Sequence, residues 1–167
     1  MSMQLRFKGK NKKVHIQEFE FAAAFYAEKL MSKRLINKLS INISFDKIPK
    51  GVSGLTDPLI EYGDNPPRAF DIYIRTSMSR KNQLSTLAHE FVHVKQYARG
   101  EISCFLRGTK LKWQKDMICT EKLNYYEYPW EIEAFGREVG LYRMYIDALS
   151  QRNYELLQER ERELKRG

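Results

Sequence analysis

The sequence predicts a protein of the α+β class, and three observations predict it. Residues 82–98 contain neither glycine nor proline and carry apolar residues at helical spacing. A second helical pattern begins at Pro129. Two short segments, 41–45 and 69–75, have the alternation or the β-branched and aromatic content of strands. Helices and strands therefore share one chain without a regular alternation between them.

The N-terminal half is expected to hold one helix and three strands. Residues 17–39 lack glycine and proline and repeat apolar residues at helical spacing, which predicts a helix. Residues 41–45 alternate strictly, as a half-buried strand does. A weaker strand is expected within 52–62, where an Asp-Pro pair interrupts it, and residues 63–67 read as a loop. The strand at 69–75 then leads directly into the helix at 82–98.

The C-terminal half is expected to contain a hairpin and a long helix. The pair Arg99-Gly100 is a typical helix end. Residues 103–120 carry two strand-like pieces and predict either a hairpin or a looser excursion of the chain. Proline favours a first helical turn, so Pro129 marks the start of the second helix. An apolar stripe is expected to form the buried face of this helix: Ile132, Phe135, Val139, Tyr142, Ile146 and Leu149. Gly136 and Gly140 suggest a close contact with another element.

Length and composition predict a single globular domain spanning residues 1–167, with a basic and mobile segment at 1–15 and a charged helix at 151–167. No run of 18 apolar residues occurs, so no membrane span is expected. The basic N-terminus lacks the apolar core of a signal peptide, which favours a cytoplasmic location. Cys104 and Cys119 are expected to be reduced thiols, with a disulfide as the less favoured alternative.

The net charge of +8 permits binding to nucleic acid or another polyanion. The densest group of cations lies near the N-terminus and comprises Arg6, Lys8, Lys10, Lys12 and Lys13. Two interpretations of this group remain open. It is either a solvated, mobile terminus, which is the favoured interpretation, or a weak contact with nucleic acid.

The helix at 82–98 contains the motif His-Glu-x-x-His, formed by His89, Glu90 and His93. In a helix, residues four apart lie on the same face, so the two imidazoles can bind one metal ion. Glu90 can then reach a water molecule bound to that metal. His89, His93 and Gln96 lie opposite the apolar face of this helix. The alternative is an ordinary exposed helix with two surface histidines.

This motif resembles the active-site helix of zincin metallopeptidases, and most closely the small SprT-like and minigluzincin groups. The resemblance covers residues 71–97 and 125–138. It implies a zincin-like fold with an N-terminal helix, a small antiparallel sheet, the motif helix, a hairpin and a C-terminal helix that carries a ligand. In such folds an edge strand binds an extended peptide.

The resemblance also implies the third metal ligand. The segment from Glu131 to Ala134 is similar to the Glu-x-x-Ala helix of gluzincins, which makes Glu131 the ligand. SprT-like enzymes use a third histidine, and this chain has none after His93. His15, Cys104 and Cys119 are weaker candidates. The expected cofactor is one zinc ion per chain, held by two histidines and one glutamate.

A helical wheel separates the carboxylates of this helix. Glu131 lies at the edge of the expected apolar stripe, whereas Glu133 lies almost opposite it, where solvent is expected. Glu138 lies on the same side as Glu131 and could orient a ligating histidine. Four further residues, each more easily explained as structural, could stabilise an oxyanion: Tyr125, Tyr126, Tyr128 and Arg137.

The sequence thus favours a zinc metallopeptidase that acts on a peptide or protein substrate, with Glu90 as general base. Two other classes of function stay open. One is a polyanion-binding module in which the histidine pair is structural. The other is a zinc-stabilised interaction protein without hydrolytic activity.

Overall fold

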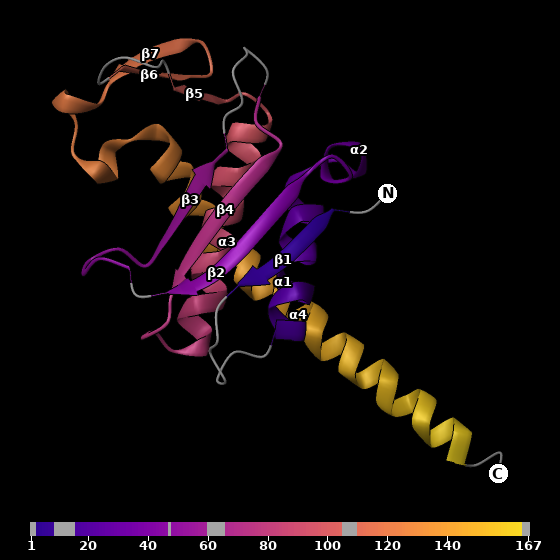
Figure 1. Cartoon of the computed structure of the whole chain (residues 1–167). Coiled ribbons are helices and arrows are strands. Elements are labelled where there is room, and N and C mark those ends of the chain that lie inside the picture. The colour runs from indigo at the N-terminus through magenta and orange to yellow at the C-terminus, as the bar shows by residue number, and fades with distance from the viewer. Residues whose placement is uncertain (1–2, 9–15, 47, 60–65, 105–109, 165–167) are drawn as a thin grey trace.

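The structure is a computed structural model, and it describes residues 3–8, 16–46, 48–59, 66–104 and 110–164. Its elements form a four-stranded sheet, three long helices on one face of that sheet, and a small second sheet (Figure 1). This arrangement belongs to the α+β class, as the sequence predicts.

The main sheet contains β1 (Gln4–Lys8), β2 (Ser40–Asp46), β4 (Ala69–Arg75) and β3 (Gly54–Pro58), in that spatial order. β1 pairs with β2 in parallel, and β2 with β4 in parallel, whereas β3 pairs with β4 antiparallel. The expectation of an antiparallel sheet is therefore wrong, because only the edge strand β3 runs antiparallel. The helices α1 and α2 connect β1 to its parallel neighbour β2, whereas the chain passes from β2 through the antiparallel strand β3 before it enters β4 parallel to β2.

β1 corrects the prediction of a mobile N-terminus for residues 4–8. Leu5 and Phe7 are half-buried, while Arg6 and Lys8 are exposed on the strand. The same alternation is present in the sequence, but the dense charge around it obscures the strand signal. Residues 9–15, with Lys10, Lys12, Lys13 and His15, lie outside the described part of the chain.

The predicted helix at 17–39 is in fact two helices, α1 (Ile16–Leu30) and α2 (Lys33–Ile36). Ser32 separates them, because its extended backbone and its hydroxyl cap the first turn of α2 by accepting a bond from the Leu35 amide at 3.4 Å. A chain that lacks glycine and proline can thus still break where a serine is available as a cap.

α3 (Arg80–Ala98) is capped by Ser79 and is buried along almost its whole length. It ends before Gly100, whose φ of 70° is the left-handed conformation expected after a helix. This confirms the helix predicted at 82–98. Both of its faces are covered, because α1 packs on one side and α4 (Pro129–Leu164) on the other.

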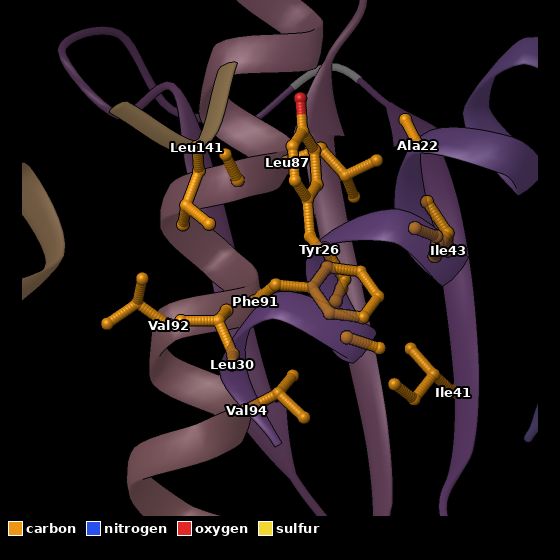
Figure 2. Close-up of a cluster of buried hydrophobic side chains, with 14 of the residues drawn as sticks. Ala22, Tyr26, Leu30, Ile41, Ile43, Leu87, Phe91, Val92, Val94 and Leu141 are labelled. Carbon is orange, nitrogen blue, oxygen red and sulfur yellow. The ribbon is translucent and has the colours of Figure 1, made fainter. Parts of the chain in front are cut away.

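The hydrophobic core lies between the main sheet and these helices, as Figure 2 shows. Ile41 and Ile43 of β2 point from the sheet toward Tyr26 of α1 and Phe91 of α3. Alternate residues of β4 do the same, namely Phe70, Ile72 and Ile74. The core therefore fixes α3 rigidly against the sheet.

The second sheet is antiparallel and contains β5 (Ile102–Cys104), β6 (Lys110–Trp113) and β7 (Asp116–Cys119). It lies beyond the C-terminal end of α3 (Figure 1). The segment predicted at 103–120 to contain two strand-like pieces thus belongs to a sheet of three strands. Two 3₁₀ turns, η1 (Thr120–Lys122) and η2 (Tyr125–Glu127), lead to α4. Cys119 is free, and the side chain of Cys104 lies outside the described part of the chain.

α4 is one continuous helix of 36 residues, which also includes most of the separate charged helix predicted at 151–167. Its C-terminal half extends away from the rest of the molecule (Figure 1). The predicted buried stripe is wrong at its N-terminal end, because Ile132 is 59% exposed and Val139 is 64% exposed. The buried face instead contains Trp130, Glu131, Ala134, Leu141 and Tyr145.

The predicted close contact at the two α4 glycines is also wrong. A Cβ atom built at Gly136 or at Gly140 would meet nothing within 4 Å. Across the described residues, no helix combines the length and the apolar character needed to cross a membrane.

Candidate metal centre

Three buried side chains from two helices meet at one point. His89 and His93 lie one turn apart on α3, and Glu131 lies in the first turn of α4. Each offers a ligand atom, and these three atoms all lie within 4.8 Å of one another. Sequence positions 42 residues apart converge because α3 and α4 pack directly against each other. The group could therefore hold a metal ion.

The distances match those of a tetrahedral site. Nε2 of His89 lies 3.1 Å from Nε2 of His93 and 3.2 Å from Oε2 of Glu131, and Nε2 of His93 lies 3.4 Å from Oε1 of Glu131. Tetrahedral zinc with bonds of about 2.0–2.1 Å places its ligand atoms roughly 3.3–3.4 Å apart. The spacing therefore fits a single ion bound between the three side chains.

Gln96 fixes which nitrogen of His93 faces this point. Its amide nitrogen donates to the Trp130 carbonyl at 2.9 Å and to Oε2 of Glu133 at 3.0 Å. Its oxygen must then face Nδ1 of His93, at 2.8 Å. Because an amide oxygen can only accept, Nδ1 of His93 carries the proton and Nε2 is left with a lone pair. Gln96 is fully buried, so this orientation is held firmly.

Glu138 performs the same role for His89. Its Oε2 lies 3.2 Å from Nδ1 of His89, and its Oε1 accepts a bond from the Ser85 hydroxyl at 2.7 Å. A carboxylate beside Nδ1 favours a proton on that nitrogen and a lone pair on Nε2. The orienting role that the sequence suggested for Glu138 matches this geometry.

Three acceptor groups therefore converge, and neither imidazole donates to the carboxylate in this arrangement. Two imidazole lone pairs and a carboxylate within 3.4 Å repel one another unless a cation or a proton lies among them. Burial alone would lower the pKa of His89. The hydrogen bonds to Glu131 and Glu138 outweigh this effect and raise the pKa to about 9. Burial likewise opposes ionisation of Glu131, but its contacts with His89 and His93 lower the pKa of this carboxyl to about 2. The centre is thus built to attract positive charge.

Glu90 lies beside this group and is almost completely buried. Burial raises the pKa of its carboxyl above the ordinary value. Its Oε2 accepts a hydrogen bond from the Thr56 hydroxyl of β3 at 2.7 Å. Gly54 of the same strand leaves the space for its other oxygen, because a Cβ at Gly54 would lie 2.5 Å from Oε1. The edge strand β3 therefore positions Glu90.

The centre lies at the floor of a cleft of about 580 Å³. Residues 51–56 before and within β3 form one wall, and Tyr125, Tyr126 and Phe135 form the other. Tyr97, Ile102 and Trp130 also line it. A small extended molecule can therefore reach the centre along the edge of the sheet.

The remaining sequence candidates take different positions. Tyr125 donates from its hydroxyl to Oε2 of Glu131 at 2.7 Å, so it touches the centre directly. Tyr128 donates instead to the Thr120 carbonyl at 3.2 Å. Arg137 donates to Oε1 of Glu133 at 2.8 Å and does not line the cleft. Tyr126 lines the cleft wall.

Glu133 is not in open solvent as predicted. It is half-buried, and its Oε1 pairs with the Lys95 ammonium at 2.6 Å. Glu133 lies away from the three ligand atoms, which agrees with the helical-wheel prediction that separates it from Glu131. The buried apolar stripe used in that prediction is nevertheless wrong at its N-terminal end. Thr56 and Gly54 lie in no sequence motif that predicts a role for them. Gln96 follows His93 by three residues on one helix face, and this spacing could have suggested its role.

No protein-family model, curated protein or solved structure matches this chain.

Proposed function

We propose that the protein is a zinc-dependent metallopeptidase similar to the minigluzincins, with zinc bound by His89, His93 and Glu131. The single observation that carries this proposal is the convergence of two imidazoles and one carboxylate, with contacts of 3.1–3.4 Å between them, beside a buried glutamate. Two histidines, one carboxylate and an adjacent Glu90 form the donor set of a catalytic zinc site rather than that of a closed structural one. The proposed zincin-like fold has the same basis.

Zinc held by His89, His93 and Glu131 would supply Lewis acidity and would lower the pKa of a bound water toward neutrality. Glu90 is placed to accept a proton from water during attack on a peptide carbonyl, and it would then deliver this proton to the leaving amine. The raised pKa of the buried Glu90 carboxyl favours the first of these transfers, because it makes the carboxylate a stronger base. The Thr56 hydroxyl holds the carboxylate in place.

The geometry of β3 supports a peptide as the substrate. Backbone bonds join Arg75 to Ser53 and Leu59 to Ala69, and the register pairs Leu55 with Tyr73. The alternate residues Gly54 and Thr56 therefore direct their backbone groups away from β4, toward the free edge. An extended peptide that adds to this edge lies along the cleft, with a carbonyl above the centre.

Metal analysis and a peptidase assay together test this proposal. We expect one zinc per chain after dialysis and cleavage of unfolded protein or peptide mixtures. Glu90→Gln should keep the zinc and lose about 10²–10⁴-fold or more in rate, since the amide cannot accept the proton. A protein without stoichiometric metal contradicts the zinc site. Native rates in Glu90→Gln contradict the base, and zinc without any cleavage favours the interaction-protein alternative.

A further inference from the structure

The cleft wall formed by α4 and η2 is an exposed aromatic surface. Tyr126 is 73% exposed, and its ring centroid lies 5.3 Å from that of Tyr125 and 5.7 Å from that of Phe135. We call these three residues the aromatic ledge. Exposed apolar area of this kind, continued along α4 by Ile132 and Val139, is typical of a binding surface.

The ledge begins at the metal centre itself. The Phe135 ring lies 4.6 Å from the imidazole of His89, edge to face, and the Tyr125 hydroxyl bonds Glu131. Adjacent residues of an extended peptide have Cα atoms about 3.8 Å apart. The side chain next to a carbonyl held at the centre can therefore reach the ledge without bending the peptide.

Among the described residues, the lining of the cleft includes no lysine or arginine, in contrast to the charge of the chain as a whole. The net charge is +8, yet none of the residues that line the cleft is lysine or arginine. Its charged lining consists of the histidine pair and the carboxylates of Glu90, Glu131 and Glu138. The opposite wall adds the exposed apolar side chains of Val52 and Leu55. An acidic side chain packed against the cleft walls, away from the metal position, would meet the carboxylates of Glu131 and Glu138 and no lysine or arginine among the described lining residues.

From these contacts we propose that the substrate is a peptide segment with a large apolar or aromatic side chain directly beside the scissile bond. This side chain packs on the aromatic ledge, and an aspartate or glutamate at the same position is rejected. The inference rests on the proposed peptidase function and names the substrate class of that site.

Binding to an inactive form tests the ledge separately from catalysis. Zinc-loaded Glu90→Gln protein is titrated with fluorescent peptides that are identical except for one central Phe, Ser or Glu. Burying a large apolar side chain contributes enough to change affinity about tenfold or more. We expect the Phe peptide to bind at least tenfold more tightly than the Ser peptide, and the Glu peptide to bind most weakly. Wild-type cleavage of the same peptides should follow this order in kcat/KM.

Variants of Tyr126 identify the surface, because this residue contacts no proposed metal ligand. Tyr126→Ala should remove most of the preference for Phe over Ser, and Tyr126→Phe should keep it. Tyr126→Lys should raise the affinity of the Glu peptide by supplying the missing cation. Tyr154→Ala, an exposed aromatic on the distal part of α4, is the matched control and should change nothing.

The possible outcomes separate the two proposals. Equal binding of the three peptides, or a preference that survives Tyr126→Ala, overturns the aromatic ledge even if peptides are cleaved. Zinc-loaded protein that prefers the Phe peptide but cleaves none of them supports the ledge and overturns the peptidase proposal.

Discussion

Gly54 lies so close to Glu90 that a Cβ atom at this position would come within 2.5 Å of the Glu90 carboxylate and within 2.6 Å of the Thr86 methyl group. The edge strand can therefore approach α3 only where it has no side chain. This closeness also lets Thr56, two residues later, bond the same carboxylate.

Gly54→Ala should accordingly damage hydrolysis while leaving the metal in place. The added methyl group must displace either β3 or Glu90, which disrupts the Thr56 bond and costs about 1–3 kcal/mol of stability through overpacking. We expect kcat to fall at least tenfold with unchanged zinc content, because no ligand atom comes from β3. Gly136→Ala is the control for the substitution itself. Wild-type kcat in Gly54→Ala would show that the close approach has no functional role.

Glu131→Ala and Glu133→Ala should differ in metal content. Glu131 contributes one of the three ligand atoms, so its truncation should abolish metal binding or weaken that binding greatly. Glu133 pairs with Lys95 and Gln96 instead, and its loss should leave stoichiometric metal. Elemental analysis of both dialysed variants measures this. The opposite result, with zinc lost only from Glu133→Ala, would refute the proposed ligand set.

The sequence predicts the centre of this molecule better than its periphery. The strands at 41–45 and 69–75 and the helix at 82–98 are confirmed because each has a strong period that burial enforces. The apolar stripe on α4 did not mark its buried face, because that face carries the buried Glu131 and the half-buried Glu138, which lower its apparent hydrophobicity. Where a helix directs a polar site toward the interior, its apolar face is no longer a reliable guide to the face that is buried.

The parallel strand pairing could not be predicted from the sequence, for a different reason. Whether β1 lies parallel to β2 depends on where α1 and α2 return the chain, and local periodicity does not contain that information. Similarly, the partnership of Thr56 with Glu90 joins residues 34 positions apart. Only the packing of β3 on α3 reveals it.

Gln96→Leu should weaken zinc binding by about 10–100-fold. The substitution removes the oxygen that holds Nδ1 of His93, and loss of such an orienting partner typically has this effect. Gln83→Leu is a matched control on the same helix, because Gln83 is also buried but bonds the Arg75 and Thr76 carbonyls away from the centre. Both variants should lose stability, and only Gln96→Leu should lose metal affinity in a competition titration. Equal affinities would show that Gln96 is merely structural.

Zinc affinity should rise with pH up to about pH 9. In the metal-free protein the pKa of His89 is raised to about 9, so below that pH a proton occupies the site and must leave when metal binds. Glu131, with a pKa of about 2, is ionised throughout this range and adds no further dependence. Release of one proton gives a roughly tenfold increase in apparent affinity per pH unit below pH 9. Competition with a chelator at several pH values measures the slope, and a flat profile would contradict it.

Gly136→Ala and Gly140→Ala should each stabilise the protein. Both glycines are exposed on α4, and a Cβ atom at either position meets nothing within 4 Å. Alanine therefore gains helix propensity without a steric cost, worth about 0.8–1.0 kcal/mol per site in a helix interior. In a protein of this size, each kcal/mol raises Tm by roughly 2–4 °C. Thermal unfolding at fixed metal content measures the shift. Destabilisation by either substitution would instead indicate that another surface packs closely on this part of α4, as the sequence alone had suggested.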